Sequence, residues 1–269
     1  MPEPTVQSRG VDATRTRTSK MPRLFVDDGG GGRRRPVLFL HAFAGDSSHW
    51  TAQLAHLRGL RRAVAFDFSA HGNSRISDVR DYSVRSLTLD VEWVVDELRL
   101  DHFVLVGHSM GAVVAAAYAG AHPGHVTALM LVDPPYVPGI MSPDQLARII
   151  KALETDPYPV TEQYWKNQLL VGSTPAVRAR VLDSLSRLPR DAVIQLTRDL
   201  LYYDPVPALT NYSGPVLAVV TPRNDLPTSI HNVVEEVEHV IVEGAGHWMQ
   251  LDEPGRFNAI LDSFLAKIN

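Results

Sequence analysis

The chain has 269 residues, a formal net charge of −4 at pH 7 and 45% hydrophobic residues. This length and composition are typical of a globular protein with one large core, and we expect one domain with an insertion. The small net charge and the lack of a basic stripe argue against a nucleic-acid or anionic-membrane partner. Because the chain contains no cysteine, disulfides, thiol nucleophiles and thiolate metal sites are excluded.

The first 21 residues are polar and rich in Arg, Ser and Thr, and we interpret residues 1–21 as a polar leader. They lack the apolar stretch of a secretory signal. An Arg-rich start is also found in transit peptides, but Glu3 and Asp12 argue against one. No apolar run reaches the length of about 18 residues that suggests a membrane span. We therefore predict a cytoplasmic protein.

Short apolar runs recur along the chain, and helical patterns follow them. Continuous apolar runs are typical of parallel strands, because helices cover both faces of such a sheet. The sequence therefore predicts an α/β fold with a mostly parallel central sheet. The predicted strands lie at 37–40, 63–66, 103–106, 129–132, 216–220 and 240–242. A further run at 24–26 ends in four consecutive glycines, which predict an antiparallel edge hairpin with the strand that follows.

Helical periodicity separates these strands. Apolar stripes over 87–98 and 257–265 each predict a helix that lies on the sheet with one face. The segment after Ser109 is apolar nearly all round, so we expect it to form the most buried helix. Within that segment, Gly111 and Ala115 are small enough to allow close approach to neighbouring strands.

Between residues 136 and 209 the strand pattern stops and about four helices are predicted. Ser142 and Thr174 each precede a proline, an arrangement typical of an N-cap followed by the first helical turn. We predict a helical lid at 136–209, inserted into a core formed by 22–135 and 210–269. Side chains of this lid are expected either to shape a pocket or to pack between lid helices: Tyr136, Tyr158, Tyr164, Trp165 and Leu169.

The motif Gly107-His108-Ser109-Met110-Gly111 lies between a predicted strand and a predicted helix. Small residues allow a sharp turn there, so that the Ser109 hydroxyl stands at the carboxyl edge of the sheet and at the start of a helix. The five residues alone are weak evidence. Their position between strand and helix, with an acid and a base later in the chain, indicates a nucleophile.

A serine hydroxyl needs a base, and the base needs a third group that orients it. His247 is the predicted base, because it lies in a glycine-rich loop after the last predicted strand. Asp225 is the predicted acid, since the order Ser, Asp, His and its loop position both fit. A turn residue that caps its own backbone is the plain alternative for Asp225. Asp133, which ends the strand at 129–132, is the alternative acid.

The reaction of a serine nucleophile also needs donors for the oxyanion of the tetrahedral intermediate. The backbone N–H of Met110 is one predicted donor. The N–H of Phe43 is the second, because its loop follows the strand at 37–40 and reaches the same edge of the sheet.

With these residues the chain resembles the α/β-hydrolase superfamily, in its lidded branch of esterases and lactonases. Five segments carry the resemblance: His41-Ala42-Phe43-Ala44-Gly45, Asp67-Phe68-Ser69-Ala70-His71-Gly72-Asn73-Ser74, Gly107-His108-Ser109-Met110-Gly111, the loop of Asp225, and Gly244-Ala245-Gly246-His247. The family has Asp in place of the serine in its haloalkane dehalogenases and epoxide hydrolases, so those reactions are disfavoured.

Two residues depart from the family pattern. Ala42 replaces a glycine. If that position needs a positive φ, an alanine there lowers stability by about 1 kcal/mol and tilts the Phe43 amide. Ala70 also replaces a glycine, which we expect to change only packing.

The resemblance implies hydrolysis of a carboxylic ester or lactone through an acyl-enzyme, with no metal or organic cofactor and a small-molecule substrate. Carbon-carbon bond hydrolysis and cofactor-free perhydrolysis or haloperoxidation use the same triad on this fold and are the alternatives. A ligand-binding receptor of the same fold is the alternative from another class. Substrate identity and oligomeric state have no signal in the sequence.

Overall fold

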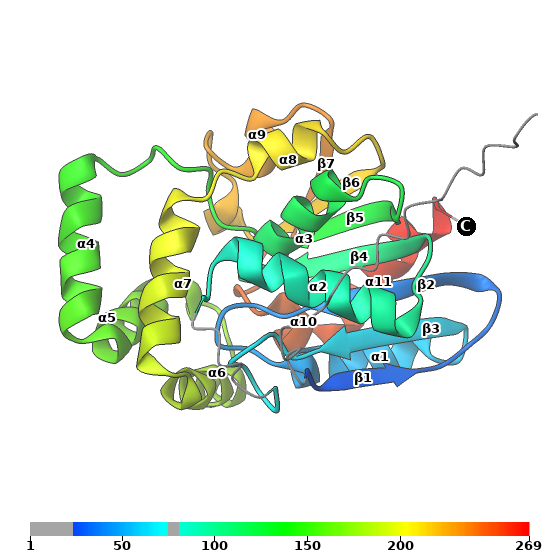
Figure 1. Cartoon of the computed structure of the whole chain (residues 1–269), viewed down its shortest axis with the longest axis horizontal. Helices are drawn as coiled ribbons and strands as arrows, with labels where there is room; N and C mark the ends of the chain where they lie inside the picture. The colour runs from blue at the N-terminus through cyan, green and yellow to red at the C-terminus, as the bar shows by residue number, and fades with distance from the viewer. Residues whose placement is uncertain (1–23, 75–80, 269) are drawn as a thin grey trace, which may run out of the picture.

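The computed structural model of the protein describes residues 24–74 and 81–268, so the predicted leader at 1–21 lies outside the described residues. Within these described residues, seven strands form one sheet in the order β1-β3-β2-β4-β5-β6-β7, with helices on both of its faces (Figure 1). The strands are β1 (Val26–Gly29), β2 (Arg34–Leu40), β3 (Arg61–Phe66), β4 (Phe103–His108), β5 (Val126–Val132), β6 (Val216–Val220) and β7 (Val237–Ile241). The predicted α/β fold is confirmed.

Strands β2 to β7 pair in parallel, and only β1 runs antiparallel to its neighbour within the described sheet. The prediction of a hairpin between β1 and the next strand is wrong, because β1 pairs with β3. Both edges of β2 are already occupied by β3 and β4, which leaves the outer edge of β3 for β1. Arg58 and Arg62 bind Asp27 and Asp28 and hold β1 in this place.

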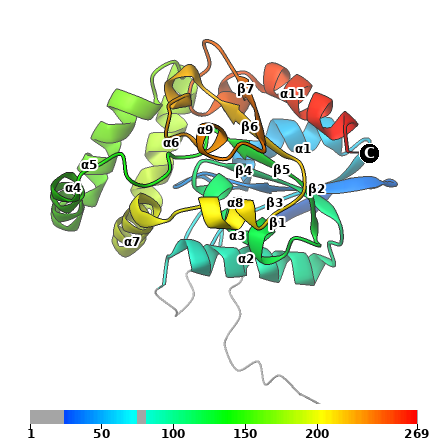
Figure 2. The ribbon, with the colours of Figure 1, turned by 90° about the horizontal axis from the view of Figure 1, so that it is seen from above.

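Helices cover the two faces of the sheet as separate layers (Figure 2). One layer contains α2 (Val84–Leu98), α3 (Met110–Ala121) and α8 (Val206–Thr210), and the other contains α1 (Thr51–Leu57) and α11 (Pro254–Ala266). Alternate residues of a strand enter different cores: Leu38 and Leu40 pack with the first layer, and Val37 and Phe39 pack with the second. This double burial explains why the strands are apolar without alternation.

Helix α3 is buried along almost its whole length, as the sequence predicts. A Cβ on Gly111 would lie 2.6 Å from the carbonyl oxygens of Leu40 and His41. Glycine is therefore required where the first turn of α3 crosses the end of β2, and the predicted close approach at Gly111 is confirmed.

A helical insertion lies between β5 and β6 at one end of the sheet (Figure 1). Its elements are α4 (Pro143–Thr155), α5 (Pro157–Tyr164), the π-helical segment η2 (Trp165–Leu169), α6 (Pro175–Arg187) and α7 (Arg190–Tyr202). The Ser142 side chain caps α4 in a capping box, and the Thr174 side chain caps α6. Proline follows each cap at the first helical position, where its missing N–H has no intrahelical partner to lose.

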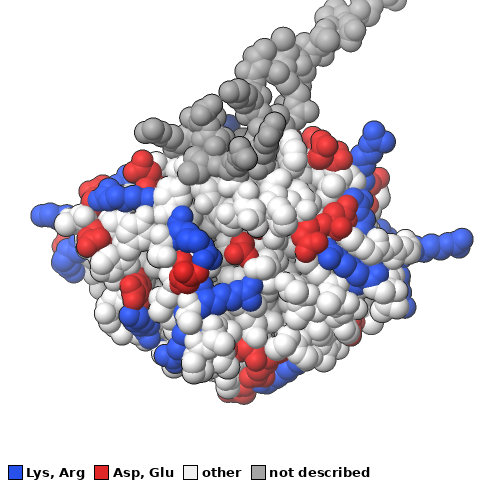
Figure 3. Space-filling model, turned by 90° about the horizontal axis from the view of Figure 1, so that it is seen from below, with Lys and Arg blue, Asp and Glu red and all other residues white. Residues whose placement is uncertain are grey.

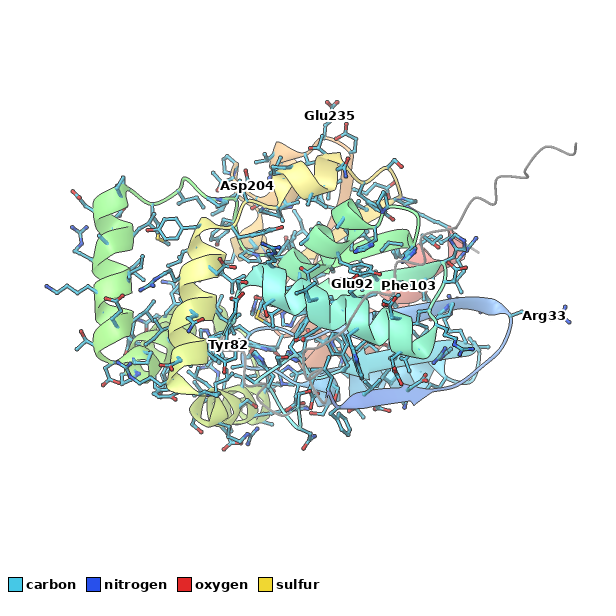
Figure 4. All side chains as sticks on the ribbon, viewed as in Figure 1. Arg33, Tyr82, Glu92, Phe103, Asp204 and Glu235 are labelled. Carbon is cyan, nitrogen blue, oxygen red and sulfur yellow. The ribbon has the colours of Figure 1, made fainter. Side chains whose placement is uncertain are left out.

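Hydrogen bonds join this insertion to both helical layers of the core. Tyr82, just before α2, lies beside α7 (Figure 4), and the Val84 N–H donates a 2.6 Å hydrogen bond to the carboxylate of Asp199 on α7. At the start of α6, the N–H and hydroxyl of Thr174 donate to Oδ1 of Asp252, which ends the short helix α10 (Met249–Asp252). The insertion is therefore held by side chains on both layers of the core.

The backbone at Ala70 corrects one prediction. Ala70 has a φ of 68°, in the left-handed region that glycine adopts freely. The replacement of the family's glycine by alanine at this position is therefore a source of backbone strain and not only a packing change, because the Cβ makes this region unfavourable.

The surface carries charges of both signs. Positive and negative side chains are interspersed over the face shown in Figure 3. None of the helices in the described part of the chain combines the length and the hydrophobicity that crossing a bilayer requires.

Candidate active site

Ser109 occupies the sharp turn between β4 and α3. Its backbone has φ 53° and ψ −115°, a conformation that non-glycine residues rarely adopt. A Cβ on Gly107 would lie 2.2 Å from the carbonyl oxygen of Gly111, so the turn closes only with small residues on both sides. The Ser109 N–H donates a 2.8 Å hydrogen bond to Val132 at the end of β5, which holds the turn in place. The Ser109 side chain is thus presented at the carboxyl edge of the sheet.

His247 lies in the turn that follows β7, and its ring contacts Asp133. Nδ1 of His247 is 2.5 Å from Oδ2 of Asp133, and both side chains are buried. A carboxylate beside Nδ1 holds the proton on that nitrogen and leaves Nε2 unprotonated in the neutral ring. The carboxylate that contacts the predicted base is therefore that of Asp133, the alternative acid.

Asp133 follows β5 directly and is held by several hydrogen bonds. Its Oδ1 accepts from the N–H and from the hydroxyl of Thr221, at 2.9 and 3.0 Å, and its own N–H donates to Val219 at 2.8 Å. Its φ of 40° is again in the left-handed region. The end of β6 therefore fixes the carboxylate that contacts His247.

Asp225 is directed away from His247. Its Oδ1 accepts hydrogen bonds from Nε2 of His231 at 3.0 Å and from the side chain of Asn232 at 3.1 Å. The hydrogen bond from His231 lowers the pKa of Asp225 below its ordinary value of 3.8. The prediction that Asp225 pairs with His247 is therefore wrong.

The reason lies in the loop between β6 and the short helix α9 (Ile230–Val233). Asn224, one residue earlier than Asp225, lines the cavity beside Ser109, and its amide donates a 2.7 Å hydrogen bond to the carbonyl of Pro134. The neighbouring Asp225 then points to the other side of the chain, where α9 offers His231 six residues later. The place of Asp225 just after β6 correctly predicted that it lies at the carboxyl edge of the sheet. It did not predict the direction of the Asp225 side chain.

The loop after β2 brings Phe43 to the same cavity. The ring of Phe43 packs edge-on against Trp165 of the insertion, with centroids 6.0 Å apart. Among the described residues, positive φ values include that of Ala44, 55°, but not that of Ala42. The strain of an alanine with positive φ, which the sequence suggested for Ala42, therefore applies to Ala44. Ala44 lies in a turn that is closed by the hydrogen bond from the Gly45 N–H to the Ala42 carbonyl.

His41 braces this loop from inside the core. Its Nδ1 lies 2.8 Å from the Ala42 carbonyl oxygen and donates to it, and its Nε2 accepts a 3.0 Å hydrogen bond from the Phe68 N–H. Burial lowers the pKa of His41 to about 4, so the ring is neutral at pH 7. The side chain thus sets the start of the loop from which the Phe43 N–H was predicted to act.

The other predicted donor is the N–H of Met110, the first residue of helix α3. The first four N–H groups of a helix have no partner within the helix and carry the positive end of its dipole. Met110 itself is fully buried, so its backbone is fixed close to Ser109.

Ser109, His247, Asp133 and Phe43 line one cavity of about 280 Å³. The helical insertion supplies most of its wall, through apolar side chains that include Met141, Ile149, Leu153, Val160, Trp165, Leu169, Leu200 and Leu201. Of the lid side chains singled out in the sequence, Tyr136 and Tyr164 also line this cavity, whereas Tyr158 donates a hydrogen bond to the Leu188 carbonyl within the insertion. The serine and the histidine therefore face a mainly apolar cavity.

Three residues at this site were missed in the sequence: Thr221, His108 and Gln250. Thr221 binds Asp133, and His108 contacts both the carbonyl of His247 and the amide of Gln250. The only sequence signal was the place of His108 in the serine motif. Nothing in the local sequence indicates the contacts of Thr221 or Gln250, because their partners come from distant segments.

Comparison with known proteins gives matches over most of the chain. The sequence model of the alpha/beta hydrolase family matches residues 37–260. The sn-1-specific diacylglycerol lipase ABHD11 of Danio rerio is 26% identical over 280 residues, which cover 95% of this chain and 86% of that protein.

Solved structures share the fold. A thermophilic esterase from Thermogutta terrifontis has a TM-score of 0.76 at 22% identity, with 91% of this chain and 93% of that chain covered. Est816, an N-acyl homoserine lactone degrading enzyme, has a TM-score of 0.78 at 22% identity, with 91% of this chain and 99% of that chain covered.

Proposed function

Because the chain belongs to the alpha/beta hydrolase family, we propose that it is a serine hydrolase that cleaves a carboxylic ester or a lactone. Ser109 is the nucleophile, His247 the general base and Asp133 the acid. The observation that carries this proposal is the 2.5 Å contact between His247 and Asp133 on the wall of the cavity that also contains Ser109.

The proposed reaction has two steps. In the first, Nε2 of His247 takes the proton from the Ser109 hydroxyl as the oxygen attacks the ester carbonyl, and the resulting imidazolium gives that proton to the leaving alcohol. In the second, water attacks the acyl-enzyme with the same help from His247, and the acid is released. Asp133 holds the imidazole in the required tautomer and stabilises its positive charge.

The oxyanion forms in both steps, and the backbone N–H groups of Met110 and Phe43 are the proposed donors. Backbone donors need no reorganisation when charge develops, which makes them effective in a site that excludes water. Support for this assignment comes from the start of α3 at Met110 and from the position of Phe43 on the cavity wall.

The cavity supports a small, largely apolar substrate. Its volume of about 280 Å³ lies near the lower end of the range for ligand pockets. The helical insertion predicted at 136–209 acts as a lid in this proposal through its part before α8, because side chains from Tyr136 to Leu201 form most of the wall of the cavity that contains Ser109. The cytoplasmic location stays a prediction.

The test is a pre-steady-state assay with p-nitrophenyl esters of short and medium chain length and with a simple lactone. We expect a burst of p-nitrophenol close to one equivalent per protein, followed by slower turnover, because p-nitrophenolate is a good leaving group and acylation should be faster than deacylation. Ser109→Ala should lower kcat by about four orders of magnitude or more and abolish the burst.

The alternatives give different outcomes in the same experiment. A receptor would bind an ester without turnover, and a carbon-carbon hydrolase would turn over a vinylogous diketone far faster than any ester. Turnover of esters that survives unchanged in Ser109→Ala would contradict the proposal.

A further inference from the structure

A second imidazole lies directly behind the candidate nucleophile. His108, the last residue of β4, is fully buried, and its ring centroid is 4.7 Å from that of His247. Its Nε2 lies 2.9 Å from the carbonyl oxygen of His247, and its Nδ1 lies 2.9 Å from the side-chain nitrogen of Gln250. No part of the reaction proposed above uses this group.

The hydrogen bonds of His108 determine which nitrogen carries the proton. The carbonyl oxygen of His247 can only accept, so Nε2 of His108 must donate. In a neutral ring the other nitrogen is then an acceptor, and the amide of Gln250 supplies the donor that it needs. The opposite tautomer would set a nitrogen lone pair against the carbonyl oxygen.

His108 is neutral because of where it lies. Burial lowers its pKa well below the ordinary value of 6.5, and the nearby rings of His247, His49 and His41 oppose a positive charge on it in the same direction. A charged ring at this position would also oppose the imidazolium that His247 must become. A neutral His108 ring therefore allows His247 to become positively charged during the proposed reaction.

Gln250 is itself held by the second layer of the core. It is fully buried in α10, and its backbone carbonyl accepts a 3.4 Å hydrogen bond from Gln53 on α1, whose amide also donates to Asn258 on α11 at 3.1 Å. The side-chain oxygen of Gln250 is buried without a hydrogen-bond partner among the described residues. The buried oxygen is unfavourable, whereas the nitrogen of the same amide has a hydrogen-bond partner in His108.

We propose that His108 is a positioning residue that ties the loop of His247 to the turn of Ser109, and that Gln250 selects the tautomer with which it does so. Ser109 is the next residue in the chain, so one rigid strand end holds the serine through its backbone and the histidine loop through an imidazole. The base and the nucleophile therefore keep their relative position when His247 gains and loses its proton. This inference rests on the proposed function for its catalytic meaning, but the contact itself is independent of the substrate.

The first test uses ¹⁵N-labelled full-length protein and long-range ¹H–¹⁵N correlation spectra of the histidine rings. In the wild type we expect His108 protonated on Nε2 and unprotonated on Nδ1 throughout the pH range in which the protein is folded. We also expect a slowly exchanging Nδ1 proton on His247, because Asp133 shields it. A His108 ring that is protonated on Nδ1 would overturn the proposal.

Two variants then test the positioning role. His108→Phe keeps the ring packing and removes both hydrogen bonds, and Gln250→Met removes only the donor to His108 and with it an unsatisfied oxygen. For both, we expect the Nδ1 proton of His247 to exchange about 10-fold faster than in the wild type, the effect of losing one hydrogen bond. We expect kcat for the p-nitrophenyl ester to fall by a similar factor, with KM within about 3-fold, since the substrate touches neither side chain.

His231→Phe is the matched control, because it replaces another buried imidazole that does not contact His247. It should leave the exchange of the His247 proton and the value of kcat at their wild-type levels.

Circular dichroism melts show whether His108→Phe is folded, which separates a loss of folding from a loss of the position of His247. If His108→Phe does not fold, Gln250→Met alone still tests the proposal. Unchanged proton exchange in folded His108→Phe and Gln250→Met would overturn the proposal, whether or not the wild type hydrolyses esters. Absence of ester and lactone turnover in the wild type, or turnover that survives in Ser109→Ala, would instead contradict the proposed function.

Discussion

In the described part of the chain, two aspartate–histidine pairs lie at the same edge of the sheet, and they differ in their surroundings rather than in the residue types that form them. In the inner pair, Nδ1 of His247 lies 2.5 Å from Asp133, and the side chains are 6% and 4% exposed. In the outer pair, Nε2 of His231 lies 3.0 Å from Asp225, whose side chain is 35% exposed. Only the inner pair shares a cavity with Ser109 among the described residues.

The two pairs also form in different ways. Asp225 and His231 are six residues apart, so a single short turn brings them together. Asp133 and His247 are 114 residues apart and meet because β5 and β7 flank β6 in the sheet. Asp133 in addition has a φ of 40° and two hydrogen bonds from Thr221, whereas Asp225 has a φ of −95°. The positive φ of Asp133, its hydrogen bonds from Thr221 and its contact with a histidine across the sheet therefore mark the candidate site better than an aspartate–histidine contact alone does.

The largest expected effect separates the two carboxylates directly. Asp133→Asn should lower kcat for a p-nitrophenyl ester by about four orders of magnitude, because the amide favours the wrong tautomer of His247. Asp225→Asn should leave kcat within about 2-fold of wild type. Steady-state kinetics at pH 7.5 check both variants, and a severe loss in Asp225→Asn with a mild one in Asp133→Asn would reverse the assignment.

A smaller effect on kcat is expected for the side chains that donate hydrogen bonds to each aspartate. Thr221→Val removes the hydroxyl hydrogen bond to Asp133 but keeps the backbone one, so we expect a loss in kcat of about 10-fold. Asn232→Leu removes the matching side-chain donor of Asp225 and should not change kcat. Equal losses in these two variants would show that the outer pair also supports the reaction.

The contact between Asp225 and His231 should instead affect how the stability of the protein depends on pH. Because His231 lowers the pKa of Asp225 in the folded state, the carboxylate contributes stability above its unfolded value of 3.8 and loses it as the pH falls through the lower, folded value. Asp225→Asn should therefore have a lower thermal midpoint than wild type at pH 7. The difference should shrink as the pH approaches about 3, which melting curves in a pH series will measure. A difference that grows on acidification would have the wrong sign for this account.

The smallest effect concerns strain outside both pairs. Ala70 has a positive φ, like Ser109 and Asp133, but it belongs to neither pair. Ala70→Gly should raise the free energy of unfolding by about 0.5 kcal/mol, because relief of the left-handed strain exceeds the added freedom of the unfolded chain. Urea unfolding measures the gain, and kcat should not change. If kcat changed as well, strain at this position would have to be counted as part of the site.

Much of the fold followed from patterns that act over a few residues. Continuous apolar runs predicted the parallel strands, the apolar stripe over 87–98 predicted α2, and the prolines after Ser142 and Thr174 marked the starts of α4 and α6. Pairing of β1 was not predictable in the same way. Its partner depends on which strand edges remain free after the rest of the sheet has formed.

The sequence by itself determined the turn at Ser109 and the loop of His247, because small residues between a strand and a helix allow few backbone conformations. It also placed both candidate acids at the carboxyl edge of the sheet, where parallel strands end. Only the tertiary structure showed that Asp133, and not Asp225, contacts His247, and only it brought His108 and Gln250 behind His247. The physical reason is that the ring of His247 meets the Asp133 carboxylate from 114 residues away, and His108 meets its partners from 139 and 142 residues away, which local patterns do not encode.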